Sequence, residues 1–305
     1  MKDRVQANSA APVLPAIPEG SEAVSLQGEP LLRPQPEAKD KLEPLLEAAQ
    51  REYVASPQSV DAAVWVGRRL AYLGRYREAI EWYSAALARH GDEPKLLRHR
   101  GHRWLTIRCI EEARADFEAA ARLLDTKPDE VEPDGIPNSR NQPISSLHSN
   151  VWYHLALAEF LLRQDEQALA ASEAGRRVST NPDRLVSQTY WQYLILRRLG
   201  RESEAKAILD PIIESLDIVE NYAYLRLLLV YKGLASEEEV LLGATGEIEM
   251  PTLAYGLGMR ALFDGNAVKA KVLFERATSG PAWPAFGFLA AEAELARTSS
   301  SSHSP

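Results

Sequence analysis

The sequence has one cysteine, no long apolar run and no excess of basic residues. Because Cys109 stands alone, no disulfide can form within the chain. No apolar stretch approaches the roughly 18 residues of a membrane-spanning helix, and no apolar signal-peptide core is visible near residue 1. A formal net charge of -8 argues against a general nucleic-acid binder, which needs a basic surface.

The sequence does repeat itself at a distance of 34 residues. Four residues recur at this step: Gly67, Ala79, Tyr83 and Ala86 return as Gly101, Ala113, Phe117 and Ala120. A fixed period of this length is typical of stacked helical hairpins. The small residues are expected where the two helices of one hairpin approach closely. Gly74 is expected to end the first helix, because glycine accepts a left-handed conformation.

These residues resemble the tetratricopeptide repeat, whose consensus has a small residue at position 8 and alanine at positions 20 and 27. Copies begin near Val60 and Pro94, and Ala168, Ala205 and Ala270 mark later ones. A degenerate fifth copy covers residues 222–240. The resemblance implies an all-α fold, a right-handed superhelical α-solenoid of about six hairpins. Capping helices are expected at residues 40–53 and 285–297.

Three segments depart from the repeat. Residues 1–37 are rich in proline, which predicts a flexible segment before a solenoid at 38–297. Residues 298–305 form a serine-rich tail that we expect to be disordered. Residues 126–149 are an insertion, because Ala113 to Ala168 spans one period plus 21 residues. Long loops are usually either functional or disordered, so an ordered lid and a mobile loop are both open alternatives for this segment.

In the tetratricopeptide family, the first helix of each hairpin lines the concave face. Carried over copy by copy, this predicts a peptide- or ligand-binding groove formed by Trp65, Arg68, Arg98, His99, His102, Tyr153, His154, Tyr190, Trp191 and Arg197. The insertion adds the polar side chains of Asn138, Arg140, Asn141 and His148. Arginine offers a rigid fork to carboxylates, which favours a peptide or a small anionic group as ligand. The alternative is that the aromatic residues pack between repeats and the arginines extend into water.

The histidines call for a separate hypothesis. His99 and His102 are three residues apart on one predicted helix, and with His154 they could hold Zn²⁺. Arg98 and Arg100 flank the pair and would repel a cation, and no carboxylate follows at a spacing suited to acid–base catalysis. We therefore predict a non-enzymatic scaffold for a protein or peptide partner, without metal or cofactor. The alternative is a metal- or small-anion-binding protein, or a hydrolase, centred on the three histidines.

The chain is also similar to a group of bacterial tetratricopeptide proteins of unknown function that are often predicted to be exported. The likeness lies in residues 98–103, 127–135 and 290–297. It implies a bacterial protein and supplies no activity. We expect a cytoplasmic location by default, or the bacterial envelope if a signal has been removed. The partner is expected to present an anionic or C-terminal group, and the oligomeric state stays open.

Overall fold

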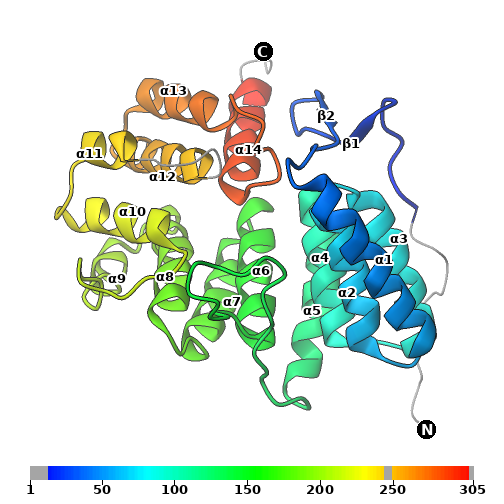
Figure 1. Ribbon diagram of the computed structural model, residues 1–305. Coiled ribbons are helices and arrows are strands. Elements are labelled where there is room, and N and C mark those ends of the chain that lie inside the picture. Colours follow the sequence, from blue (N-terminus) through cyan, green and yellow to red (C-terminus); the bar gives the residue numbers. More distant parts are fainter. Residues whose placement is uncertain (1–12, 244–248, 302–305) are drawn as a thin grey trace, which may run out of the picture.

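The computed structural model describes residues 13–243 and 249–301, which are mostly helical (Figure 1). A two-stranded hairpin of β1 (Ser21–Val24) and β2 (Pro30–Leu32) comes first. Fourteen helices follow in the described residues: α1 (Lys39–Ala55), α2 (Val60–Tyr72), α3 (Tyr76–His90), α4 (Pro94–Thr106), α5 (Ile110–Leu124), α6 (Leu147–Leu161), α7 (Asp165–Arg177), α8 (Pro182–Arg198), α9 (Glu202–Ala207), α10 (Tyr222–Lys232), α11 (Glu237–Leu242), α12 (Glu249–Phe263), α13 (Ala267–Ala277) and α14 (Phe286–Ser301).

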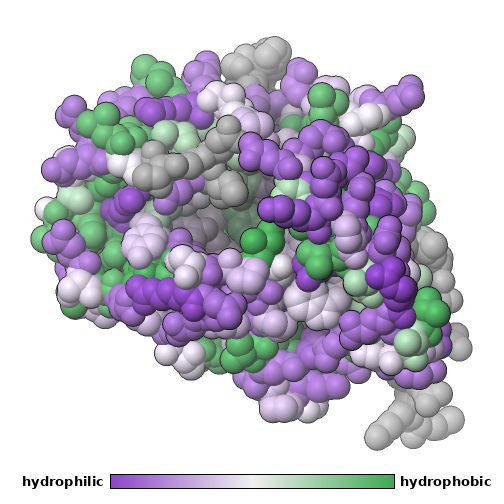
Figure 2. Space-filling model, in the orientation of Figure 1, coloured by the Kyte–Doolittle hydropathy of each residue, from purple (hydrophilic) through white to green (hydrophobic). Residues whose placement is uncertain are grey.

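Helices α2 to α13 form six consecutive hairpins. Each first helix packs against the first helix of the next hairpin, so that α2, α4, α6, α8, α10 and α12 make one continuous row. Helix α1 packs on α2, and α14 packs on α12 and α13. The predicted all-α, right-handed superhelical solenoid with a capping helix at each end is confirmed. In space-filling form the face seen in Figure 1 is hollowed near its centre (Figure 2).

The turn of every hairpin contains a left-handed residue, with φ between 65° and 80°. This residue is the second of three turn residues in five hairpins and the first of four in the fifth hairpin. Four hairpins have glycine there, namely Gly74, Gly200, Gly233 and Gly265, and two have arginine, Arg108 and Arg163. A left-handed conformation is unfavourable for a residue with a Cβ atom, so the two arginines are exceptions that need a reason.

The N-terminal region differs from the flexible segment expected at residues 1–37. Strands β1 and β2 pair, Leu31 is buried, and Glu22 is only 1% exposed. Glu22 accepts a hydrogen bond from Arg33 Nε at 2.6 Å and another from the backbone N–H of Arg77 at 3.2 Å. These contacts tie residues 13–37 to the first hairpin, while residues 1–12 lie outside the described residues. At the other end, α14 continues to Ser301 where a disordered tail was expected, and residues 302–305 lie outside the description.

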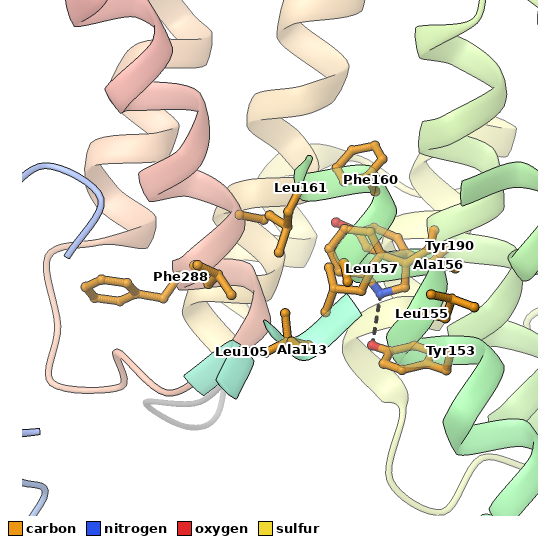
Figure 3. Packing of buried hydrophobic residues seen from close by; sticks show 14 of the residues in the cluster. Leu105, Ala113, Tyr153, Leu155, Ala156, Leu157, Phe160, Leu161, Tyr190 and Phe288 are labelled. Carbon is orange, nitrogen blue, oxygen red and sulfur yellow. Dashed lines mark hydrogen bonds between the residues drawn. The ribbon is translucent and has the colours of Figure 1, made fainter. Parts of the chain in front are cut away.

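A single apolar core runs along the row of hairpins. Figure 3 shows its middle part, where Tyr153, Phe160 and Tyr190 lie close together and Phe288 of α14 lies apart from them at one side of the view. The dashed line marks the hydrogen bond from Trp191 Nε1 to Tyr153 Oη, 2.9 Å long. In the described parts of the chain, no helix has both the length and the apolar character needed to cross a bilayer.

The packing inside the hairpins leads to a first prediction. A Cβ atom on Gly67 would lie 2.2 Å from Cζ of Tyr83. Alanine normally stabilises a helix by about 1 kcal/mol relative to glycine, but overpacking costs about 1–3 kcal/mol. We therefore expect Gly67→Ala to lower the free energy of unfolding by up to about 2 kcal/mol in urea denaturation. Gly280→Ala is the control, since nothing lies within 4 Å of its added Cβ. Equal midpoints for both variants would contradict this packing.

Candidate functional site

A small pocket opens between α2 and α4, with a volume of about 140 Å³. We call it the basic pocket, and its lining consists of Arg68, Ala71, Tyr72, Tyr83, Arg98, His99, His102 and Arg103. Three guanidinium groups and two imidazoles thus share a lining that contains no carboxylate. Arginine stays protonated at neutral pH, so the pocket is cationic. The structure brings four of the predicted groove residues together here, and Arg103 joins them.

Two of these arginines lack an acidic partner. Arg68 donates from Nε and Nη2 to Tyr72 Oη, at 3.3 and 3.1 Å, and its guanidinium lies 4.5 Å from the Trp65 ring centroid. The guanidinium of Arg103 lies 5.5 Å from the ring centroid of Tyr76. Neither Arg68 nor Arg103 forms an ion pair with any residue that the structure describes. Their charges are therefore offset only by aromatic rings and a phenol oxygen.

The third arginine, Arg98, forms an ion pair with a carboxylate of the insertion. Nη2 of Arg98 lies 2.9 Å from Oε2 of Glu132, which also accepts a hydrogen bond from Asn150 Nδ2 at 2.5 Å. Glu132 is missing from the residues predicted for the site, because it lies outside the repeat. A signal was present nonetheless: Asp129, Glu130, Glu132 and Asp134 form an acidic stretch beside the arginine-rich second copy.

The insertion folds back on itself and is tied to the first hairpin. Residues 131 and 146, both within the insertion, form an antiparallel bridge. The Gly135 carbonyl accepts a hydrogen bond from Arg69 Nη1 of α2 at 3.1 Å. The insertion residues that were predicted to bind a ligand contact other parts of the chain. Asn138 donates to Glu220 at 2.7 Å and Arg140 pairs with Asp217 at 2.7 Å, both near the start of α10. His148 contacts the Lys127 carbonyl, and Asn141 occupies a left-handed turn with φ of 49°.

A second pocket of about 200 Å³ adjoins the first and shares Arg68 and His99 with it. We call it the Trp65 pocket, and its remaining lining is Asp61, Val64, Trp65, Lys95, Glu130, Val131, Glu132 and Pro133. The insertion forms one wall and α2 the other. Trp65 and Val131 add apolar surface to this pocket, whose lining also contains three carboxylates.

The other aromatic residues predicted for the groove are part of the core. Tyr190 and Trp191 are 0% and 1% exposed, and Tyr153 accepts the Trp191 indole hydrogen bond while its hydroxyl lies 2.8 Å from that of Tyr224. Arg197 lies farther along the row, where it donates to Tyr193 Oη at 3.0 Å. For Tyr190 and Trp191 the packing interpretation describes the structure better than the groove interpretation.

The three histidines lie close together, with His99 and His154 buried and His102 half-buried. The rings of His102 and His154 have centroids 4.7 Å apart, and the Phe286 ring lies within 5.4 Å of both. The Nδ1–H of His154 donates to the Asn150 carbonyl at 2.6 Å. Among the described residues, no group of three or more His, Cys, Asp or Glu side chains is placed to hold a metal ion. The metal or hydrolase alternative is therefore not favoured.

The contact between the two helices of a hairpin recurs along the chain. A Cβ on Gly67, Gly101 or Gly258 would meet the aromatic ring 16 residues later at 2.2, 2.7 and 2.5 Å respectively. This is the small residue expected at position 8, in the place where the consensus requires it. The fold is tetratricopeptide-like. In the fourth hairpin, position 8 is instead Tyr193, which stacks on Tyr231 with ring centroids 4.5 Å apart, and the second helix there is the short α9.

Comparison with solved structures finds distant likenesses to tetratricopeptide repeat proteins. No protein-family model and no curated protein matches the chain. A tetratricopeptide repeat protein from Parabacteroides merdae is 16% identical over 83% of this chain and 93% of its own, with a TM-score of 0.49. YrrB, described as having an unusual peptide-binding site, is 16% identical over 82% and 99%, with a TM-score of 0.43. The P58(IPK) domain is 13% identical over 86% and 95%, with a TM-score of 0.26. At such distances these likenesses carry no argument about the site.

The buried histidines lead to a prediction on pH. Burial, and next the nearby arginines, lower the pKa of His99, His102 and His154 well below the usual value. The unfolded chain binds protons near pH 6.5 that the folded chain cannot, so their contribution to stability is present above this pH and is lost as the pH falls. Each such histidine contributes a slope of up to about 1.4 kcal/mol per pH unit.

The measurement is urea unfolding at pH 7.5, 6.5 and 5.5. We expect His154→Gln to reduce the loss of stability between pH 6.5 and 5.5 relative to wild type, because it removes one of the groups that protonates only on unfolding. His148→Gln is the control, since this half-buried side chain lies at the start of α6 and contacts the Lys127 carbonyl rather than another histidine. If His154→Gln and wild type lose stability in parallel, the histidine does not stay neutral in the folded protein.

Proposed function

We propose that this chain is a non-enzymatic scaffold that binds a protein or peptide partner at the basic pocket, the Trp65 pocket and the adjoining insertion. This proposal rests on the basic pocket. A chain with a net charge of -8 places Arg68 and Arg103 in one small pocket without an acidic partner among the described residues. Gathering like charges is unfavourable, so an anionic ligand is the complement that relieves it.

The chemistry of the ligand follows from the two neighbouring pockets. A guanidinium donates two parallel hydrogen bonds to a carboxylate, and the basic pocket has room for one compact anionic group. The Trp65 pocket offers Trp65, Val64 and Val131 to an apolar side chain next to that group. We therefore propose a peptide whose C-terminal carboxylate or acidic side chain enters the basic pocket. Glu132 already neutralises Arg98, so Arg68 and Arg103 are the primary contacts.

Two features support the absence of an enzymatic role. The histidines of this face are held neutral by burial. Burial also raises the pKa of the Cys109 thiol to about 11, so the thiol is protonated and a poor nucleophile at neutral pH. Neither group is prepared for acid–base or nucleophilic chemistry.

The test begins with affinity capture of partners by the wild-type chain and by the Arg68→Ala, Arg103→Ala double variant. For a captured partner, its C-terminal peptide is then titrated by calorimetry, once with a free carboxylate and once amidated. We expect the double variant to weaken binding by about 1–3 kcal/mol, which is the usual range for an interface residue that dominates binding.

Arg122→Ala is the matched control, since Arg122 is exposed on α5 and outside both pockets. It should bind as wild type does. Equal affinity of the double variant and wild type would contradict the proposed site. Binding of inorganic phosphate with equal loss in the double variant, but of no peptide, would instead favour the small-anion alternative.

A further inference from the structure

Contacts in a helical-repeat protein are normally confined to neighbouring repeats. Residues 283–297, which we call the C-terminal latch, break this rule by reaching the first four hairpins. Trp283 packs edge-on against Tyr76 of the first hairpin, with ring centroids 5.5 Å apart. Its indole Nε1 donates to the Leu32 carbonyl at 2.9 Å. The last part of the chain thus lies against the first, as Figure 1 shows for α14 and the strands.

Arg108 anchors the latch from the turn of the second hairpin. Its Nε donates to Glu292 Oε2 and its Nη2 to the Trp283 carbonyl, both at 2.9 Å. This buried guanidinium belongs to a residue with φ of 70°, at a position where four other turns have glycine. A disfavoured conformation persists where surrounding contacts require it, and here those contacts are to the latch.

Two further contacts extend the latch to the third and fourth hairpins. Arg297 donates to the Leu161 carbonyl, and Nη1 of Arg198 lies 3.9 Å from Oε1 of Glu294. These bonds, like that of Arg108, join a charged side chain to a residue far away in the sequence. Because ion pairs and hydrogen bonds contribute modest net stability, the set is suited to reversible release.

Phe286 of the latch occupies part of the predicted binding surface. Its ring centroid lies 5.2 Å from that of His102 and 5.4 Å from that of His154, and it lies 6.1 Å from that of Tyr153. All three partners were predicted to contact a ligand. The chain's own aromatic side chain is present there instead.

We propose that the C-terminal latch is an internal competitor for the concave face. The latch holds the superhelix closed. The partner that replaces it is an acidic peptide with an aromatic residue, because such a peptide offers the same groups as Glu292 and Phe286. Release leaves every contact between adjacent hairpins in place, so the superhelix opens without unfolding. Helix α14 moves together with the sixth hairpin, because Gly287 lies directly against the Pro251 backbone. This inference does not depend on the ligand of the basic pocket.

The first experiment is small-angle X-ray scattering of the full chain. Phe286→Ala, Glu292→Gln removes the ring contacts of Phe286 and the Arg108–Glu292 ion pair while Arg108 stays, and Arg108→Gly removes the anchor and places glycine at the turn. We expect a larger radius of gyration and maximum dimension for both variants, with helical circular dichroism unchanged. Arg163→Gly is the matched control, since this left-handed arginine is exposed and its side chain forms no hydrogen bond or ion pair with the described residues. Wild-type scattering from both latch variants, or loss of helix in both, would overturn the proposal.

The second experiment uses a labelled peptide of residues 281–298 as the probe. We expect it to bind the Phe286→Ala, Glu292→Gln chain at least tenfold more tightly than wild type, whose site is occupied. The same peptide carrying those two substitutions should lose this preference. Equal binding of the unmodified peptide to both chains, or binding to neither, would contradict competition for one surface. If the Arg68→Ala, Arg103→Ala variant bound its partner as wild type does, the result expected for this labelled peptide would not change.

Discussion

The structure depends on how closely the two helices of each hairpin approach one another. Where Gly67 meets Tyr83 and Gly101 meets Phe117, the missing Cβ lets an aromatic ring lie against the helix backbone. This close approach sets the angle and distance between the two helices of a hairpin. Because the same contact recurs 34 residues later, the first helices of successive hairpins align in a row. Residues at matching positions of neighbouring copies then become neighbours in space. The basic pocket exists because this register places Arg68 beside Arg98 and Arg103.

Much of this was predictable, because the repeat is a local signal. The hairpins, the left-handed turn at Gly74 and the grouping of Arg68, Arg98, His99 and His102 all follow from matching positions in copies one and two. The degenerate fourth and fifth copies were recognisable from spacing even though Tyr193 replaces a small residue.

What escaped prediction depends on contacts between distant parts of the chain. Glu132 reaches Arg98 from an insertion without periodicity, and Glu292 reaches Arg108 across most of the sequence. The ordering of residues 13–37 depends likewise on Trp283 and Arg77. Burial of Trp191 was an open alternative because exposure of an inner face depends on what closes over it. No pattern within one repeat contains that information.

The distribution of acidic partners defines the chemistry of the inner face. Arg98 and Arg108 each form an ion pair with a carboxylate, so their charges bind the insertion and the latch. Arg68 and Arg103 have aromatic contacts instead. We propose that this difference makes the basic pocket an anion site. Anomalous diffraction from crystals soaked in bromide tests it directly. We expect a bromide peak between Arg68 and Arg103 that is lost in the Arg103→Ala variant. Bromide bound elsewhere on the chain, with none in this pocket, would contradict it.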